Sequence, residues 1–409
     1  MSLQENVRGQ RRVKGWTQEQ LAEEADLSVG TVRKVEQGGT VSVETIHALA
    51  RALGTTTSSL FASEAPAPVH EAEGDGPKLT ELRRALMPPI GLTTAMPEPT
   101  DIRDLHSIQS DIDDSHSLYQ VDRYDSVARR LPGILRASET AVALSEGEAR
   151  EQAVATRAGA FLLAGKYLTQ VRRYDMAYHA LSRAIVDARN VGETQLAATG
   201  VVGMGWLLLR QDRFDEAEQL AAVTAQEIEP RPSTATPGQW AVWGELNLRV
   251  ASAARRNNRP DVAKAARRMA ATAASGLARE HVNFREHWTT FGPVTAEAKA
   301  IEDLALIGDA RGVLSRADDG PVGPKALKRL GRPSANNWDR HRLDVARAYT
   351  ILGSHQDAMD ELCSIKETSS EWLKHQKMAR RVMGDILTRR KRTLTQEMRD
   401  MASHLGIAG

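Results

Sequence analysis

A short pattern that returns along most of the chain constrains its fold more than any other feature of the sequence. Each clear copy has an arginine, then an aromatic residue or proline, then an aspartate, with Val or Ala two positions later. The arginines lie 50, 40 and 46 residues apart by their numbers, and apolar helical patterns stand on both sides. Such a recurrence predicts pairs of helices that stack on one another. The clear copies are Arg123–Val127, Arg173–Ala177, Arg213–Ala217 and Arg259–Ala263, and the weaker ones are Ser354–Ala358 and Gly308–Val313.

Small side chains at fixed distances from each copy indicate the same arrangement. Ala177 is followed by Leu181 and Ala184 at four and seven residues, and Gly165 and Leu168 precede it by twelve and nine. Small residues let two helices approach closely, and the larger apolar residues fill the gap between neighbouring pairs. No segment shows a sustained alternation of polar and apolar residues, so we expect an all-α chain with no sheet.

Composition divides the 409 residues into three zones. Residues 1–62 predict a compact helical domain, residues 63–77 a flexible linker, and residues 78–409 a helical repeat domain. The middle zone has only one aliphatic residue larger than alanine, Val69, so it cannot bury enough apolar surface to order itself. Near the C-terminus, Ser370–Arg392 has the spacing of one long amphipathic helix, which we expect to cap the repeats.

The composition also excludes several classes of protein. The formal net charge is +1, so any nucleic-acid site must be local, and no apolar run reaches the roughly 20 residues of a membrane span. The single cysteine, Cys363, excludes an internal disulfide and fits a reducing cytoplasm. His281 and His287 lack the spacing of a metal site, and no nucleophile–base pair can be argued. We therefore expect no cofactor, no metal ion and no enzymatic activity.

The sharpest local patterns lie near the N-terminus. Thr17 and Gln20 have the spacing of a capping box, which predicts that a helix begins directly after Thr17. Ser28 is placed to cap a second short helix, and Ser42 a third, which Gly54 should end. The expected inward side chains of this domain are Leu21, Ala22, Ala25, Val32, Val35, Ile46, Leu49, Ala50, Leu53 and Leu60.

Two short helices joined by a tight turn, within a five-helix domain of about sixty residues, form a helix-turn-helix. The string closely resembles the phage-repressor/Cro (XRE) group of DNA-binding domains over residues 5–61. It departs at Gly9-Gln10, where the group usually has an aliphatic residue, and at Gly30, which is often polar. The residues that carry the resemblance are Gly15, Thr17-Gln18, Leu21-Ala22, Ser28, Thr31-Val32, Val35-Glu36, Gly38, Leu49-Ala50 and Ala52-Leu53-Gly54.

The resemblance implies that the second short helix enters the major groove of DNA. Arg33 and Lys34 would donate hydrogen bonds to guanine O6 and N7, and Val29 would contact a thymine methyl group. Gln18 stands where members of the group bind a phosphate, and the preceding arginines are candidates for further backbone contacts. The implied DNA-binding residues are Gln18, Ser28, Val29, Gly30, Thr31, Arg33, Lys34, Arg8, Arg11 and Arg12.

The repeats, over residues 105–365, resemble the tetratricopeptide repeat (TPR), although their period exceeds its length of about 34 residues. A helix-turn-helix domain joined to such an α-solenoid resembles the bacterial regulators that include sensors of secreted peptides. The resemblance implies a transcriptional regulator that binds double-stranded DNA at an inverted repeat, dimerises, and senses a peptide or small molecule. The 42 arginines and 12 lysines are typical of a GC-rich genome, where such proteins commonly regulate secondary metabolism.

An alternative stays open. Residues 1–62 hold seven basic and seven acidic side chains, so the small domain could instead dock a protein, with the repeats as an interaction scaffold. Aromatic and amide side chains in the middle of the repeats are candidates for a ligand groove, although the tryptophans could equally belong to the core. The candidates are Trp206, Trp240, Trp243, Asn247, Asn283, His287, Trp288 and Phe291.

Overall fold

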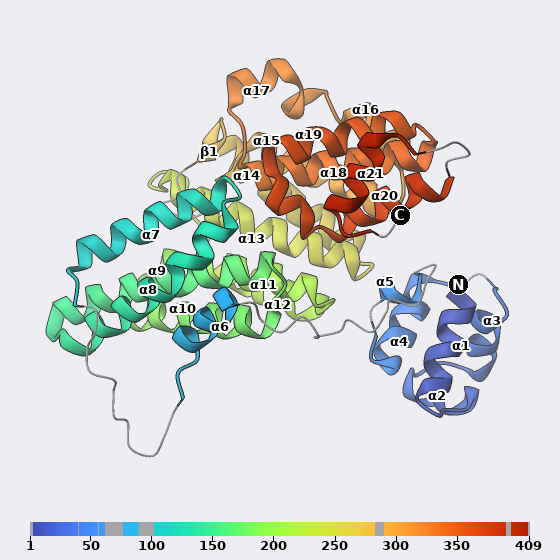
Figure 1. The fold of residues 1–409 in the computed structure, drawn as a ribbon, viewed down its shortest axis with the longest axis horizontal. Helices are drawn as coiled ribbons and strands as arrows, with labels where there is room; N and C mark the ends of the chain where they lie inside the picture. Colours follow the sequence, from blue (N-terminus) through green and yellow to red (C-terminus); the bar gives the residue numbers. More distant parts are fainter. Residues whose placement is uncertain are drawn as a thin grey trace. The chain divides into compact units, whose positions relative to one another are not determined.

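Figure 1 shows the computed structural model, which describes residues 3–39, 41–55, 57–61, 77–89, 102–282, 290–389 and 394–407. The chain separates into two compact units, Met1–Gly76 and Pro77–Gly409, and each has its own hydrophobic core. The linker expected at residues 63–77 lies outside the described residues, except for Pro77, where the first helix of the second unit begins. The described residues are almost entirely helix and turn, so the fold is all-α.

The helices of the N-terminal unit are α1 (Leu3–Val13), α2 (Gln18–Glu24), α3 (Val29–Glu36), α4 (Val43–Leu53) and α5 (Thr57–Leu60). Thr17 and Gln20 accept hydrogen bonds from each other's backbone N–H groups, so the predicted capping box is confirmed. Ser28 and Ser42 cap α3 and α4 through their hydroxyl groups. Gly54 ends α4 at φ 67°, in the left-handed region that favours glycine.

The core of this unit contains every side chain that the sequence placed inward. Val7 of α1 and Leu60 of α5 complete it, and both are fully buried. Asn6, next to Val7, donates a hydrogen bond from Nδ2 to the carbonyl oxygen of Leu60 at 3.0 Å. This bond joins the first helix of the unit to the last, so the five helices form one closed structure.

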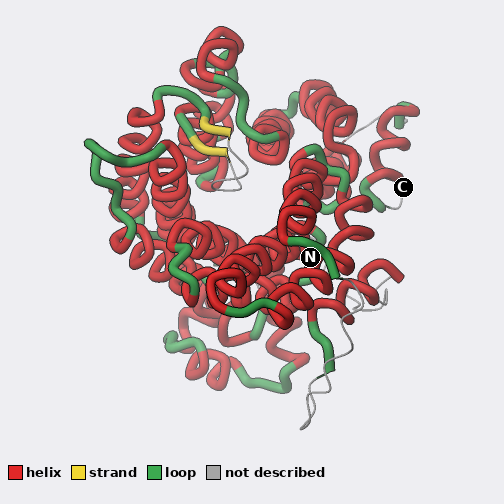
Figure 2. Tube along the Cα trace, turned by 90° about the vertical axis from the view of Figure 1, so that its left-hand side faces the viewer, coloured by secondary structure: helices red, strands yellow, loops and turns green. Residues whose placement is uncertain are grey.

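The C-terminal unit is a succession of helices in which, from α7 to α14, each helix packs against the next. Figure 2 shows helices of the chain arranged along a curved path. The first helices of the unit are α6 (Pro77–Leu86), α7 (Leu105–Gln120), α8 (Tyr124–Leu144), α9 (Gly147–Gln170), α10 (Tyr174–Asn190), α11 (Thr194–Arg210), α12 (Phe214–Glu227), α13 (Pro237–Arg256) and α14 (Pro260–Leu277). After them come α15 (Pro293–Leu306), α16 (Ala310–Arg316), the 3₁₀ helix η1 (Gly320–Val322), α17 (Pro324–Leu330), α18 (Ala335–Leu352), α19 (His355–Lys374), α20 (Lys377–Arg389) and α21 (Gln396–His404).

The recurrent sequence pattern corresponds to a recurrent backbone turn. In each clear copy, the residue before the arginine has a positive φ, between 56° and 66°, at Asp122, Arg172, Asp212 and Asn258. The N–H of the following arginine then donates to the carbonyl oxygen five residues earlier at 2.8–3.0 Å, which closes the preceding helix. The next helix begins directly after that arginine, so one short turn reverses the chain between two helices.

Three further junctions use the same turn with glycine at the positive-φ position. Gly308 and Gly353 belong to the weaker copies of the pattern, whereas Gly192, between α10 and α11, has no recognisable copy around it. At all three, the residue after glycine donates to the carbonyl oxygen five positions back at 2.9–3.0 Å. The turn is therefore more regular than the sequence pattern that predicts it.

Close approach of the paired helices explains the small residues near these turns. A Cβ atom added to Gly165 of α9 would lie 2.6 Å from the side chain of Leu181 on α10. One added to Gly200 of α11 would lie 2.6 Å from Ile185 on the same neighbour. Leu181 is itself fully buried, so these glycines set the distance between consecutive helices.

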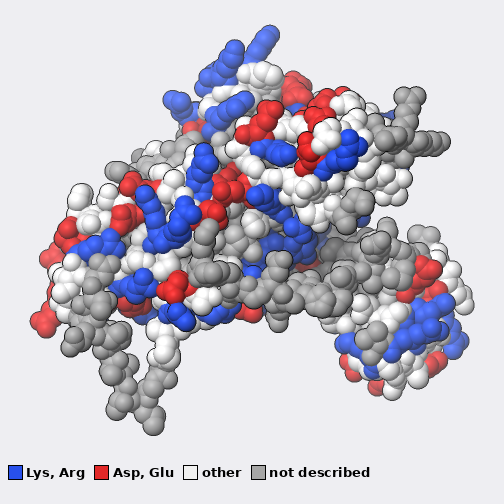
Figure 3. All heavy atoms as spheres, viewed as in Figure 1, with Lys and Arg blue, Asp and Glu red and all other residues white. Residues whose placement is uncertain are grey.

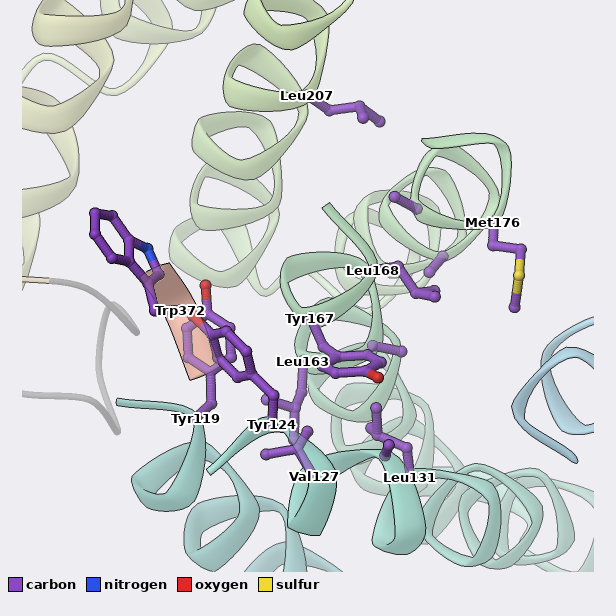
Figure 4. Packing of buried hydrophobic residues seen from close by; sticks show 14 of the residues in the cluster. Tyr119, Tyr124, Val127, Leu131, Leu163, Tyr167, Leu168, Met176, Leu207 and Trp372 are labelled. Atoms are coloured by element: carbon purple, nitrogen blue, oxygen red, sulfur yellow. The ribbon is translucent and has the colours of Figure 1, made fainter. Parts of the chain in front are cut away.

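The last helices of the unit return to its first helices. Tyr124, at the start of α8, donates a hydrogen bond to Asn336 of α18 at 3.4 Å and lies 6.4 Å, ring to ring, from His375. Figure 4 shows Tyr124 in a buried cluster with Tyr119, Tyr167 and Trp372. Helices more than 200 residues apart in the sequence therefore share one core.

Two expectations about secondary structure are wrong. The chain forms one small antiparallel pair, in which β1 (His281–Val282) lies beside β2 (Thr290–Phe291). Strands of two residues are too short to show alternation in the sequence. The helix expected at Ser370–Arg392 is divided between α19, whose Ser369 has non-helical φ −137° and ψ 52°, and α20. No helix in the described part of the chain is long and apolar enough to cross a membrane.

Candidate nucleic-acid interface

The predicted DNA-binding side chains come from three helices: three arginines from α1, Gln18 from α2, and the rest from α3 and its cap Ser28. Ser28 caps α3 by accepting the N–H of Thr31 at 3.1 Å, which fixes the direction in which the helix leaves the turn. Val32 and Val35 face the core, and the residues between them face outward. Ser28, Gly30, Arg33 and Lys34 are exposed, Thr31 is half-buried, and Val29 packs partly against the core.

Glu36, at the end of α3, is the central buried charge of the unit. Its side chain is 1% exposed and accepts hydrogen bonds from Arg11 at 2.6 and 3.0 Å and from Gln18 at 2.8 Å. Arg11 also donates to the carbonyl oxygen of Trp16 at 2.8 Å, and Arg8 donates to the carbonyl oxygen of Glu36 at 2.9 Å. One carboxylate therefore ties α1, α2 and α3 together.

The ionisation of Glu36 depends on these donors. Burial by itself would raise the pKa of the carboxyl group. The hydrogen bonds from Arg11 and Gln18, together with the charges of Arg11 and Arg8, outweigh burial and lower that pKa below its ordinary value. The hydrogen bond to Glu36 likewise raises the pKa of Arg11, so the pair is charged at neutral pH.

The predicted phosphate-binding residues differ in how far this network buries them. Arg11 is 12% exposed and fully engaged, whereas Arg8 is 46% exposed and Arg12 is exposed. Gln18 also accepts a hydrogen bond from Arg33 at 3.3 Å, and Arg33 forms an exposed ion pair with Glu19 at 3.2 Å. The sequence identified Glu36 only as part of the resemblance, although its place four residues after the inward Val32 puts it on the inner side of α3.

Lysine and arginine side chains gather on the face of the N-terminal unit seen in Figure 3, with acidic side chains beside them. Lys14 lies 4.5 Å from the ring centre of Trp16 and donates to the carbonyl oxygen of Ala52 at 3.0 Å, so it closes the C-terminal end of α4. The charge that faces solvent on α3 comes from Arg33 and Lys34. A local basic surface thus exists within residues 1–62, whose net charge is zero.

Of the five ligand candidates that the structure describes in the C-terminal unit, three lie in its core, and Trp206 and Trp240 are half-buried. Trp243, Asn247 and Phe291 are 4%, 7% and 0% exposed, so they cannot line an open groove. Trp243 donates to the carbonyl oxygen of Ala225 at 3.1 Å, which is how a buried indole is satisfied. Trp240 is half-buried and packs edge-on against Trp243. Asn283, His287 and Trp288 lie outside the described residues.

Comparison with known proteins adds one finding for the N-terminal unit. The helix-turn-helix family HTH_3 matches residues 9–60 of the chain. A search of curated proteins finds no match. The match and the fold agree on a helix-turn-helix domain at the N-terminus, and such a domain points to DNA binding.

Proposed function

We propose that this protein is a sequence-specific DNA-binding transcriptional regulator. The observation that carries the proposal is the exposed row of Ser28, Gly30, Arg33 and Lys34 on α3, the second helix of a helix-turn-helix. A helix of this kind fits the major groove, where arginine and lysine read guanine. The family match over residues 9–60 supports the same assignment.

We assign roles to the ten candidate residues as part of this proposal. Arg33 and Lys34 would read bases, Val29 would contact a thymine methyl group, and Gly30 would permit close approach of α3 to the base edges. Gln18, Ser28, Thr31, Arg8 and Arg12 would contact the phosphate backbone. Arg11 acts through Glu36 as a positioning residue, because its guanidinium group is engaged inside the unit.

The C-terminal unit is a TPR-like α-solenoid that dimerises and receives a peptide or small-molecule effector. The recurrent turn at seven helix junctions supports a repeat architecture. A dimer would present two α3 helices to half-sites about one helical turn apart, or a multiple of it, which predicts an inverted-repeat operator. Reading the chromosome places the protein in the cytoplasm, and this function needs neither catalysis nor a cofactor.

Selection of genomic DNA fragments by the purified full-length protein, followed by sequencing, tests the proposal directly. A regulator should enrich one inverted repeat, and binding to it should weaken steeply as salt rises because counterions are released. If no DNA sequence is enriched, and the protein instead binds a partner protein with an affinity that does not change with salt concentration, the docking scaffold would be favoured. A sedimentation mass equal to one chain, with and without DNA, would refute the dimer.

A further inference from the structure

The C-terminal unit contains a cavity of about 110 Å³, partly open to solvent, between helices that are far apart in the sequence. Four basic side chains line it, from α9, α13, α15 and α18, and no aspartate or glutamate belongs to its described lining. A lining of one sign, within low-dielectric walls, concentrates the electrostatic potential inside the cavity. The four are Lys166, Arg249, Lys299 and Arg340.

Trp206 of α11 gathers these cations around its ring. The charged groups of Arg340, Arg249 and Lys299 lie 4.8, 5.2 and 5.5 Å from the ring centre. Arg210, one turn further along α11, lies 5.1 Å from the same centre. The electron-rich face of the indole holds positive groups together that would otherwise repel one another.

The carboxylates of this region lie outside the cavity lining. Arg249 forms an ion pair with Glu245 at 2.9 Å, and Lys299 forms one with Glu302 at 2.6 Å. Arg340 instead donates to the amide oxygen of Gln376 at 3.2 Å and lies over the rings of Trp206 and Trp372. The carboxylates thus attract the cations from positions outside the lining, and the side chains that line the cavity carry only positive charge.

Two residues that line the same cavity each have a hydrogen-bond donor without a partner. Nη1 of Arg249 and Nε1 of Trp372 are buried and have no hydrogen-bond partner within the described part of the chain. Trp372 is fully buried, and Figure 4 shows it at the edge of the cluster near Tyr119. Asn336 and Asn337, in the first turn of α18, also line the cavity, so the positive end of that helix lies at the same place.

The ionisation of the lining follows mainly from burial of its cationic groups. Burial lowers the pKa of Lys166 to about 7. The negative charge of Glu245 opposes this shift, and the positive charge of Arg249 adds to it. Burial and the neighbouring Arg210 lower the pKa of Arg340 to about 10. An anion among these groups would reverse both effects by supplying the missing negative charge.

We propose that this cavity binds a compact anion, a phosphate or carboxylate group carried by a small molecule. Ordinary small-molecule pockets measure roughly 300–1,000 Å³, so this cavity fits a compact group better than an extended peptide. Unpartnered donors, four cations and a helix N-terminus together match the acceptor oxygens of such a group. The inference rests on the proposed function where it names this anion as the effector class.

Titration calorimetry on the full-length protein tests the site without DNA. Inorganic phosphate and citrate serve as the two probes, each at constant ionic strength, so that a phosphate site is distinguished from a carboxylate site. Wild type should bind at least one of them saturably. Arg340→Gln and Lys166→Gln should each weaken that binding about tenfold or more, since each removes one charge-assisted contact. Arg213→Gln, which alters an arginine paired with Glu216 outside the cavity, should change nothing.

The outcomes separate the site from the proposed function. Absence of saturable binding of both probes to wild type overturns the site, and so does an equal loss in the Arg213→Gln control. Circular dichroism and thermal unfolding show whether the variants are folded, and a folded wild type that the bound anion stabilises against heat supports the site independently. Anion binding by a protein that selects no DNA would keep the site and refute the regulator.

Discussion

The N-terminal unit surrounds one buried carboxylate, Glu36, with donors, whereas the C-terminal unit gathers buried cations around a cavity. Every charge in the first cluster has a partner of opposite sign within the unit. In the second, Arg340 is matched by an amide and by aromatic rings. A buried charge that is paired with an opposite charge can hold helices together. A buried charge without such a partner costs free energy unless a bound ligand supplies the opposite charge. The cluster around Glu36 therefore stabilises the fold, whereas we assign ligand binding to the cluster around the cavity.

Glu36→Gln tests the structural side of this comparison and should have the largest effect. The substitution leaves the Arg11 guanidinium buried without its counter-charge, which should destabilise the N-terminal unit by about 3 kcal/mol. Amide hydrogen exchange of peptides within residues 17–36 reports that unit separately from the rest of the chain. Glu19→Gln is the matched control, because its ion pair with Arg33 is exposed, and it should leave exchange unchanged.

The same variant predicts a pH dependence. Since the pKa of Glu36 is lower in the folded unit than the ordinary value near 4.3, the stabilisation is present above that value and is lost as pH falls through the folded pKa. In wild type, the protection of residues 17–36 against amide hydrogen exchange should fall in acid. In Glu36→Gln, protection is already reduced at neutral pH and should fall little further in acid. Equal acid sensitivity in both proteins would contradict the role of Glu36.

Arg33→Ala with Lys34→Ala should give the next largest effect, on DNA binding. Loss of two base contacts should weaken operator binding about a hundredfold or more, because each good pair contributes roughly 1–3 kcal/mol. Competition against non-operator DNA, measured at one fixed salt concentration, checks it. If the double variant binds its operator as tightly as wild type, α3 is not the recognition helix, whereas unchanged protection of residues 17–36 shows that the fold is intact.

The contrast between the two units also explains what the sequence could predict. Caps such as Thr17, Ser28 and Ser42 act within four residues, so local sequence specifies them, and the structure confirms all three. The inward residues of α2 to α4 follow from helical spacing for the same reason. Glu36 was harder, because its partner Arg11 is 25 residues away and no spacing rule joins them.

The cavity of the C-terminal unit could not be predicted, because it is assembled from distant segments. Lys166 and Arg340 are 174 residues apart, and only the return of the last helices to the first brings them together. Among the aromatic and amide candidates, Trp206 does line the cavity, whereas Trp243 and Asn247 fill the core. The available indication was a lysine inside the largely buried helix Gly147–Gln170, a position where burial of a charged group is costly.

Protonation of Lys166 provides a smaller test of the receptive cluster. With a pKa of about 7, this lysine is mostly charged at pH 6 and mostly neutral at pH 8, so anion affinity should rise about tenfold as pH falls between them. Sulfate is a suitable probe, since its own charge does not change over that range. Lys166 faces His116 and Tyr119 of α7, and Glu245 and Arg249 of α13.

Two variants decide whether the lysine carries that dependence. Lys166→Gln should remove most of it, whereas His116→Gln should retain it. A dependence that follows the histidine, measured by calorimetry at both pH values, would transfer the titration to His116, whose Nε2 lies 3.3 Å from the lysine.

Arg340→Gln should have the smallest effect on the ligand-free protein, and this completes the comparison with Glu36. Its removal breaks no direct ion pair among the described residues. The loss of its contacts with Trp206 and Trp372, and of its attraction to Glu302 and Asp344, is offset by relief of its burial and of repulsion from Arg210 and Arg256. The net change in the free energy of unfolding should be below about 1 kcal/mol, because the two contributions are of similar size and opposite sign. Thermal unfolding without added anions measures it. A loss as large as that of Glu36→Gln would mean that Arg340 holds the helices together as Arg11 does, and that the C-terminal cluster is structural as well.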